Sequence, residues 1–360
     1  MQNKETALIA MSGGVDSSVA AYLMVKKGYE CMGTTMRLYR NEDIGLCNFH
    51  TCCSQKDIDD AAEVAFNLDI PYEVLDFTFD FKDKIIDKFI STYEAGGTPN
   101  PCIDCNRFMK FDKLMQFAKE KQLDFVVTGH YARIENKNGR FLLKKARDLS
   151  KDQSYVLYSL TQEQLAHTLF PLGDYEKSET RKIAEENGFV NSKKPDSQDI
   201  CFVPDGDYVK FMENYIGKHY EKGNYLDKNG NVIGTHEGAV HYTIGQRKGL
   251  KIALGEPVYV FDKNMADNTV SIGEEKLLFK KHLIADEMNW IAFDMLTSDI
   301  RVKAKTRYRQ KEQWATVSPL DNGEISLTFD EPQRAMTVGQ AVVLYDEDTV
   351  VGGGTIKKVY

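Results

Sequence analysis

The sequence predicts a multidomain α/β protein built around a doubly wound parallel sheet near its N-terminus. The first ~130 residues alternate between strand-like and helix-like segments, and a glycine-rich turn joins the first strand to the first helix. A chain of 360 residues is also too long for one typical core. After residue 205 glycine becomes frequent, and strand-like segments follow. We therefore predict an N-terminal domain at 1–205, a small mixed central domain at 206–280 and a C-terminal β-barrel at 281–360.

The first strand and helix flank the stretch Met11-Ser12-Gly13-Gly14-Val15-Asp16-Ser17-Ser18. Residues 7–11 are short and apolar, as in a buried parallel strand. Residues 18–27 form an apolar helix with two lysines in its last turn, and Gly28 fits its C-cap. A strand, a glycine turn and a helix direct backbone N–H groups and the positive helix end at one point, which predicts a phosphate site.

The glycine pattern differs from the common nucleotide-binding motifs. It has no Gly-Lys-Ser/Thr, so it lacks the Walker lysine that reaches a terminal phosphate, and it is not Gly-x-Gly-x-x-Gly. Ser-Gly-Gly-x-Asp-Ser instead resembles the pyrophosphate loop of enzymes that split ATP to AMP and pyrophosphate. The alternative is a turn that is merely rich in small residues.

The following segments continue the alternation. Further strands are expected at 29–36, 70–75 and 125–128, helices at 57–68, 79–93 and 106–121, a hairpin at 131–146, and helices at 161–169 and 177–187. Because ligands bind beyond the carboxyl ends of parallel strands, the ends at Met11, Met36 and Gly129 are expected to face one pocket. The polar segment 41–54 is expected to be mobile.

Composition and charge narrow the class of protein. The chain is 42% hydrophobic and 28% charged, as is ordinary for soluble globular proteins. No apolar run approaches the ~20 residues of a membrane span, and no signal peptide precedes the first strand, so we expect a cytoplasmic protein without a membrane partner. A net charge of −8 argues against indiscriminate nucleic-acid binding, but it leaves room for a local basic surface.

Seven cysteines are an odd number, which favours buried, catalytic or metal-binding thiols over a disulfide framework. Cys102-x-x-Cys105 allows three interpretations: half of a metal site, a redox dithiol, or one reactive thiol with a neighbour. A zinc site would need a second pair, which the irregularly spaced Cys47, Cys52 and Cys53 supply poorly. Cys105 precedes the helix predicted at 106–121, and a helix N-terminus lowers the pKa of a thiol.

Cys201 follows a polar stretch and precedes an apolar one. Alone it would be a core cysteine. Together with Cys105 and an adenylating loop it suggests sulfur transfer, because a persulfide can displace an adenylated oxygen.

A cationic pattern marks the C-terminal region. Cations stand at every second position, namely Arg301, Lys303, Lys305, Arg307, Arg309 and Lys311. This spacing predicts a β-strand with one cationic face. The face is either a solvated edge that resists aggregation or a surface for a phosphate backbone, and we favour the second.

Three further polar stretches are ambiguous on their own. Residues 151–155 could begin a helix, His130 could be structural, and 241–247 combines a turn glycine with polar side chains.

Six motifs in this order resemble those of the tRNA-specific 2-thiouridylase family, within the ATP-pyrophosphatase superfamily. They are Ser-Gly-Gly-Val-Asp-Ser (12–17), Thr-Pro-Asn-Pro-Cys-Ile-Asp-Cys-Asn (98–106), Thr-Gly-His-Tyr-Ala-Arg (128–133), Lys-Asp-Gln-Ser-Tyr (151–155), Asp-Ser-Gln-Asp-Ile-Cys-Phe (196–202) and Tyr-Thr-Ile-Gly-Gln-Arg (242–247). The first motif alone would indicate only the superfamily, whereas the ordered set spans essentially the whole chain.

The resemblance implies an adenine nucleotide alpha-hydrolase-like domain that 2-thiolates the wobble uridine, position 34, of tRNA. The uridine 2-oxygen would be adenylated with release of pyrophosphate, and a persulfide would then give 2-thiouridine. Cys201 would carry the persulfide, received from a sulfur donor or relay protein. Cys105 would attack it and close a transient disulfide with Cys201.

The implied ligand contacts form two groups. ATP, with Mg²⁺, would contact Ala10, Met11, Ser12, Gly13, Gly14, Val15, Asp16, Ser17, Met36 and Gly129. The tRNA would contact Asn100, Pro101, Cys102, His130, Lys151, Asp152, Gln153, Arg307, Tyr308 and Gln340, with 100–102 at the target base.

One departure from the family pattern leaves a cofactor open. Some members carry Asp where this chain has Cys102. Cys102, Cys105 and Cys201 could then hold an iron–sulfur cluster.

Two other functions also stay open. An amide-forming synthetase of the same superfamily would need neither reactive cysteines nor a cationic strand. A nucleotide-sensing RNA-binding protein would bind ATP and tRNA without releasing pyrophosphate.

Overall fold

The computed structural model describes residues 4–40, 55–196, 199–203, 205–252 and 255–360. The chain divides into two units. Unit 1 comprises Met1–Ile86, Pro101–Asp207 and Asp348–Val350, and unit 2 comprises Asp87–Asn100, Tyr208–Glu347 and Val351–Tyr360. The segment 41–54, for which mobility was expected, lies outside the described residues, and so do Cys47, Cys52 and Cys53.

A five-stranded parallel sheet organises unit 1. Its strands are β1 (Thr6–Ala10), β2 (Glu30–Arg37), β3 (Tyr72–Asp76), β4 (Phe125–Val127) and β7 (Thr168–Leu169), in the order β3-β2-β1-β4-β7. The order reverses direction between β1 and β4, which is where open α/β sheets bind ligands. The prediction of a doubly wound parallel sheet is confirmed.

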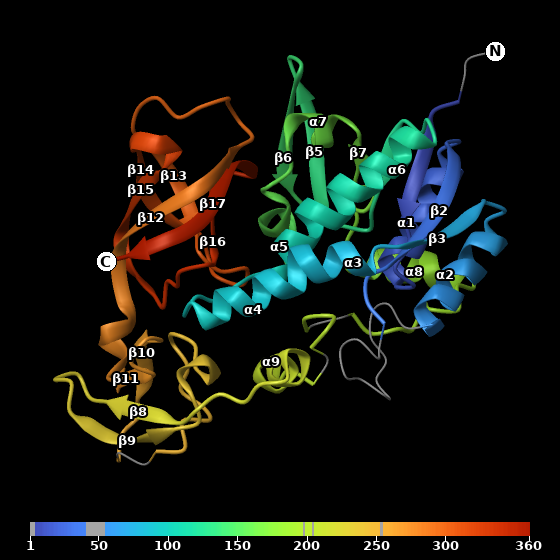
Figure 1. Ribbon diagram of the computed structural model, residues 1–360. Coiled ribbons are helices and arrows are strands. Elements are labelled where there is room, and N and C mark those ends of the chain that lie inside the picture. The colour runs from blue at the N-terminus through green and yellow to red at the C-terminus, as the bar shows by residue number, and fades with distance from the viewer. Residues whose placement is uncertain (1–3, 41–54, 197–198, 204, 253–254) are drawn as a thin grey trace. The chain divides into compact units, whose positions relative to one another are not determined.

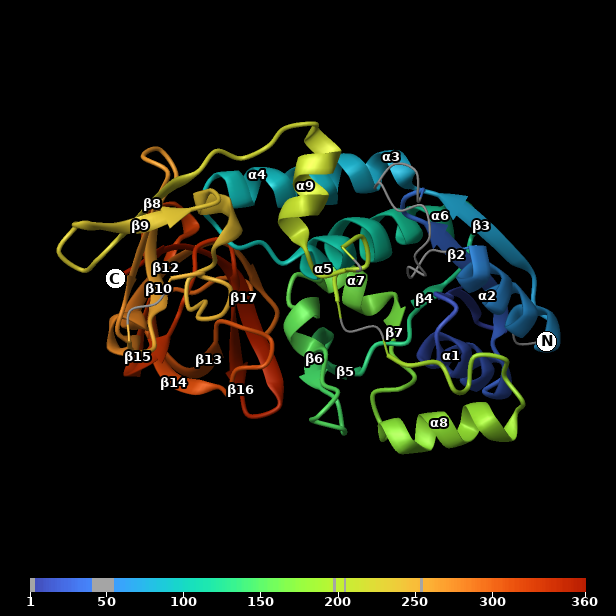
Figure 2. The ribbon, with the colours of Figure 1, turned by 90° about the horizontal axis from the view of Figure 1, so that it is seen from below.

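Helices cover both faces of this sheet (Figure 2). Ala7 and Ile9 of β1 pack in the core that contains α1 (Val15–Lys26), α2 (Gln55–Asn67) and α8 (Lys177–Glu186). Leu8 faces the opposite way, toward α6 (Leu114–Glu120). Successive residues of a strand point to opposite faces of the sheet. A strand that is buried on both faces must therefore be apolar at every position.

The remaining elements of unit 1 correct two predicted boundaries. α5 (Pro101–Asp104), η2 (Cys105–Lys113) and α6 follow one another directly, so this helix begins at Pro101 and not at residue 106. Proline is well suited to a first helical position, because it lacks only an N–H that would have no partner there. The predicted helix at 161–169 is α7 (Gln162–Ala166), and its last two predicted residues instead form β7.

The other local predictions for this part of the chain hold. The predicted hairpin is β5 (Ala132–Lys137) with β6 (Arg140–Lys145), and a 3₁₀ turn, η3 (Ser154–Leu157), follows it. The predicted helix at 79–93 is the run of α3 (Thr78–Phe81), η1 (Lys82–Ile86) and α4 (Asp87–Glu94).

Unit 2 contains a small sheet and a barrel. The small sheet comprises β8 (Gly223–Leu226), β9 (Val232–His236), β10 (Tyr259–Asn264) and β11 (Thr269–Gly273), and α9 (Tyr208–Ile216) precedes it. The barrel strands are β12 (Phe279–Trp290), β13 (Ile300–Lys305), β14 (Gln313–Pro319), β15 (Ile325–Arg334), β16 (Ala341–Asp346) and β17 (Thr349–Val359). β12 pairs with both β15 and β17, which closes the ring seen in orange and red in Figure 1. The predicted β-barrel is confirmed.

The predicted cationic strand over 301–311 is wrong in its second half. β13 ends at Lys305, and the chain then turns because the Thr306 N–H and hydroxyl both donate to Gln310 Oε1 at 2.9 Å. The face is not uniformly exposed either, since Lys305 is buried with its Nζ 5.2 Å from the ring centre of Tyr345. Arg301 and Lys303 stay accessible, each 5.4 Å from the ring centre of Trp314.

Candidate functional site: a glycine loop at the sheet switch point

The loop between β1 and α1 is built as an anion site. Gly14 is the N-cap of α1, and no side chain caps this end. The first N–H groups of a helix have no acceptor within it, and they carry the positive end of the helix dipole. These N–H groups are therefore available to a phosphate.

Gly13 fixes the path of the loop. Its φ is +69°, and a Cβ at this position would lie 2.3 Å from the backbone oxygen of Asp57 on α2. Ser17 closes the loop from the other side, because its hydroxyl accepts from Ser12 N at 3.1 Å and donates to Gly14 O at 3.0 Å. Both the conformation and the space at Gly13 require glycine.

The carbonyl group of Gly13 accepts hydrogen bonds from two side chains of the segment that follows α8. Asn191 Nδ2 donates to it at 3.1 Å and Lys194 Nζ at 2.9 Å. Lys194 also pairs with the buried carboxylates of Asp57 and Asp60. These contacts bind the loop through a carbonyl oxygen and not through its N–H groups.

Asp16, in the first turn of α1, accepts hydrogen bonds from two buried side chains. Lys177 Nζ lies 2.7 and 2.8 Å from its two carboxylate oxygens, and the Tyr131 hydroxyl lies 2.9 Å from Oδ1. Burial and the neighbouring Asp16 charge raise the pKa of Tyr131, which therefore acts as a neutral donor.

Asp196 joins this arrangement to a second group of cations. Its carboxylate accepts from Lys151 Nζ and Lys177 Nζ at 2.8 Å, and from Arg181 Nη2 at 3.0 Å. Burial acts to raise its pKa, but the hydrogen bonds and charges of Lys151 and Lys177 outweigh burial and lower the pKa to about 2. Asp196 is therefore an anion at neutral pH.

The switch point brings the predicted adenosine-side residues toward the loop. Gly129 follows β4, and a Cβ there would lie 2.8 Å from Asp16 C and Ser17 N. Met36 lies near the end of β2, which pairs with β1, and Met11 N donates to Thr34 O at 2.8 Å. The structure thus gathers Ala10 to Ser17, Met36 and Gly129 at one edge of the sheet, as the strand ends predicted.

The thiols differ in exposure. Cys31 is buried, which raises its pKa to about 11, whereas Cys105 and Cys201 are half-buried and Cys102 is exposed. Since the helix starts at Pro101, Cys102 lies in its first turn and Cys105 one turn later, which corrects the prediction of Cys105 at the helix N-terminus. Cys201 is anchored through its carbonyl oxygen, which accepts from the Tyr39 hydroxyl at 2.7 Å.

His130 lies in the interior. Its Nδ1 is 2.7 Å from the Thr128 hydroxyl and its Nε2 is 3.4 Å from Lys110 Nζ. Burial, with Lys110 nearby, holds the pKa of His130 well below its usual range. This position argues against a direct contact of His130 with RNA, because the imidazole is covered by Phe111 and Phe170.

The residues predicted at 151–153 have roles within the protein. Lys151 binds Asp196, and Asp152 accepts from the N–H groups of Ala146 and Ser154. Gln153 Oε1 accepts from Tyr131 N at 2.9 Å.

Four further predicted contact residues belong to unit 2. Arg307 is half-buried and its Nη2 donates to Ala335 O at 2.9 Å and to Ile244 O at 3.3 Å, whereas Tyr308 is exposed. Gln340 Nε2 donates to Thr98 O at 2.9 Å and so holds the segment that leads to Asn100.

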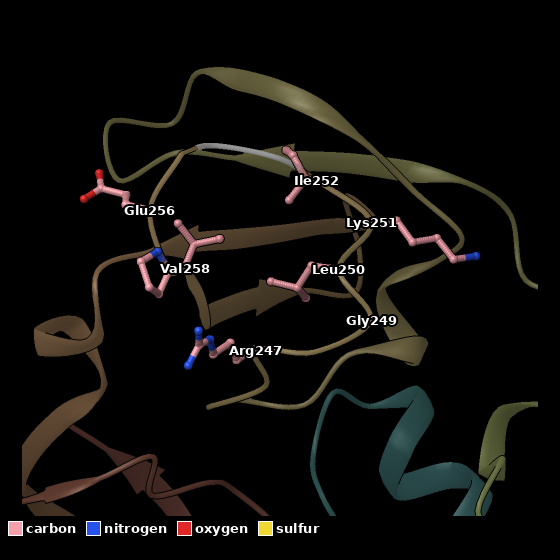
Figure 3. A pocket seen from close by; sticks show the side chains of 8 residues that line it. Arg247, Gly249, Leu250, Lys251, Ile252, Glu256 and Val258 are labelled. Carbon is pink, nitrogen blue, oxygen red and sulfur yellow. The ribbon is translucent and has the colours of Figure 1, made fainter.

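Unit 2 also has an open pocket of about 430 Å³, lined by residues that lie between β9 and β10 in the sequence. Figure 3 shows Leu250, Ile252 and Val258 around it, with Lys251 directed away. None of the predicted site residues lines this pocket.

Two features of other classes of protein are absent from the described residues. No three His, Cys, Asp or Glu side chains among 4–40, 55–196, 199–203, 205–252 and 255–360 are grouped to hold a metal ion. In the same part of the chain, no helix combines the length and apolar character that crossing a bilayer requires.

Sequence reasoning missed Lys177, Tyr131 and Lys194. One signal was available, because Lys177 is the first residue of α8, and a cation is unfavourable at the positive end of a helix. Lys194 and Tyr131 carry no comparable local signal.

Comparison with known proteins finds matches along most of the chain. Three family models match, described as tRNA methyl transferase HUP domain at 5–205, tRNA methyl transferase PRC-barrel domain at 209–274 and aminomethyltransferase beta-barrel domain at 280–356. A protein of Clostridioides difficile (strain 630) named tRNA-specific 2-thiouridylase MnmA is 50% identical over 353 residues, 98% of each chain.

Two more proteins of that name are similarly related to this chain. The one from Clostridium beijerinckii is 48% identical over 99% of each chain. The one from Clostridium acetobutylicum is 47% identical over 97% of this chain and 99% of its own.

Proposed function

Because the chain belongs to the tRNA-specific 2-thiouridylase family, we propose that it is the ATP-dependent sulfurtransferase that makes 2-thiouridine at the wobble position of tRNA. The observation that carries this proposal is full-length identity near one half to named 2-thiouridylases. The uncapped loop at the N-terminus of α1 supports the ATP-dependent step.

In the first step, the uridine 2-oxygen attacks the α-phosphorus of ATP. A bond forms between this oxygen and phosphorus, the bond to the bridging oxygen breaks, and pyrophosphate leaves with the electron pair. The amides of Gly13 and Gly14 would face the charge that develops on the leaving group. Met36 and Gly129 would lie against the adenosine.

In the second step, we propose that the terminal sulfur of a persulfide on Cys201 attacks C2 of the base and AMP leaves. Cys105 then attacks the Cys201 sulfur, the sulfur–sulfur bond breaks, and the transferred sulfur stays on the base. The two cysteines end as a disulfide, which an external thiol reductant must reduce before the next cycle. The partial exposure of both thiols supports this assignment.

The partners follow from this chemistry. We propose a tRNA substrate contacted by Asn100 to Cys102, Lys151 to Gln153, Arg307, Tyr308 and Gln340, a persulfide donor or relay protein, and a cytoplasmic location. We also propose three domains, at 1–205, 206–280 and 281–360, the last of which contacts tRNA.

The metal expectations differ in how well the residues fit. Among the described residues, Cys102, Cys105 and Cys201 belong to no group of three His, Cys, Asp or Glu side chains that could hold a metal ion, and we propose no step that uses an iron–sulfur cluster. We propose that Mg²⁺ arrives with the phosphates of ATP, since it usually keeps waters and is held by one or two carboxylates plus phosphate oxygens.

The test combines the protein with ATP, a persulfide source and unmodified tRNA, and measures 2-thiouridine and pyrophosphate. We expect both products from the wild type, and neither Cys105→Ser nor Cys201→Ser should form 2-thiouridine. Cys31→Ser is the matched control, because that thiol is buried. Pyrophosphate without thiolation would favour a different adenylating enzyme, and binding without pyrophosphate would favour a nucleotide sensor.

A further inference from the structure

Lys177 occupies an unusual position for a lysine. It is the first residue of α8, where the helix dipole disfavours a cation, and only 9% of it is exposed. Such a placement costs free energy unless an anion compensates for it. Asp16 and Asp196 provide that compensation, at 2.7 to 2.8 Å from Nζ.

Asp196 has two further cationic partners besides Lys177. It already accepts from Lys151 at 2.8 Å and from Arg181 at 3.0 Å. Lys177 and Tyr131 both donate to Asp16, in the first turn of the helix that begins at the glycine loop. The ammonium group is therefore tied to the first turn of α1, the helix whose N-cap is Gly14 of the loop.

We propose that Lys177 is the phosphate-binding cation of this loop, and that it contacts the pyrophosphate part of ATP. The loop itself has no lysine, so a side chain 161 residues after Asp16 would have the role that a lysine within the motif has in a Walker loop. This inference rests on the proposed function, because it assigns a residue to the same adenylation step.

The chemical role follows from the charge that moves. When the bond between the α-phosphorus and the bridging oxygen breaks, the electron pair stays on the pyrophosphate. The Lys177 ammonium group, which Asp16 and Asp196 already hold in place, would stabilise the new charge without first having to be ordered. Asp196 is a positioning residue in this scheme, because it acts through Lys177.

The test measures the affinities of the full-length protein for ATP, inorganic pyrophosphate and AMP by calorimetry. Loss of one hydrogen bond to a charged group corresponds to about a 10- to 100-fold change in affinity. We therefore expect Lys177→Met to weaken ATP and pyrophosphate by that factor and to change AMP less than about twofold. Lys177→Arg should restore much of the difference.

Two controls keep the test decisive. Lys182→Met removes a cation from the exposed side of the same helix and should leave all three affinities unchanged. Lys177→Gln keeps a donor for Asp16, and it replaces the Met variant where the latter does not fold. An unchanged ratio of ATP to AMP affinity in the Met or Gln variant overturns the proposal, because a purely structural ion pair would affect all ligands alike. Failure of the proposed function is distinct, since the wild type would then form no 2-thiouridine.

Discussion

Gly13→Ala tests whether close packing against Asp57, and not glycine conformation alone, shapes the loop. Gly13 has φ +69°, and an added Cβ would lie 2.3 Å from the backbone oxygen of Asp57. The left-handed conformation costs alanine about 1 kcal/mol, and forcing a methyl group into a filled space costs about 1–3 kcal/mol more. We expect a loss of about 2–4 kcal/mol in the free energy of unfolding.

Gly28→Ala is the matched control. Gly28 also has a positive φ, +91°, but a Cβ there meets nothing within 4 Å. It should therefore show only the conformational cost of about 1 kcal/mol. Urea unfolding gives the two losses, and calorimetry gives the ATP affinity, which should fall at least about tenfold in Gly13→Ala and stay unchanged in Gly28→Ala. Equal losses of stability in the two variants would refute the packing argument.

Three further predictions concern the charged and buried groups. The pKa of Asp196 lies below its ordinary value, so its ionised carboxylate contributes about 2 kcal/mol to the free energy of unfolding above pH ~4. This contribution is lost as the pH falls toward 2. The urea midpoints of Asp196→Asn should lack this pH dependence. Burial lowers the pKa of His130, so the free energy of unfolding should fall as the pH drops below ~6.5, where the unfolded chain takes up a proton. His130→Asn should flatten this dependence of stability on pH, whereas the exposed control His219→Asn should not. Arg307→Met should lower the free energy of unfolding by about 2 kcal/mol, because its hydrogen bonds to the Ala335 and Ile244 carbonyl groups are lost. Arg309 is exposed, so Arg309→Met should weaken only tRNA binding, measured by filter retention in low salt. Equal stabilities of the two arginine variants would contradict this.

Most of the fold could be predicted because its signals are local. The apolar strands and the glycine turn locate β1, α1 and β4 within a few residues, and the strand ends identify the edge that carries the loop. Boundaries failed where tertiary contacts decide them. β7 is a two-residue strand that exists only because it pairs with β4, and no local pattern distinguishes it from the end of a helix.

The cationic pattern shows a second limit of local reasoning. Alternation at 301–311 correctly indicates a strand up to Lys305, but it cannot say where that strand ends or what covers its face. The turn depends on Gln310 bonding back to Thr306, and the burial of Lys305 depends on Tyr345 from another strand. The basic surface that stays accessible is therefore smaller than the pattern implied.

The site residues that lie within one motif were predicted from the sequence. The site residues that come from a distant segment of the chain were missed. The absence of a lysine from residues 12–18 correctly distinguishes this loop from a Walker loop, but it does not mean that the loop lacks a cation. Packing of α8 against α1 brings Lys177 to Asp16, and the carboxylate of Asp196 also binds its ammonium group. Asp196 also begins the motif that ends at Cys201 and Phe202, so the contacts that position the loop's cation belong to the same stretch of chain as the proposed persulfide thiol. The ion pairs of Lys177 with Asp16 and Asp196 therefore connect the glycine loop to the first residue of the motif that contains the proposed persulfide thiol.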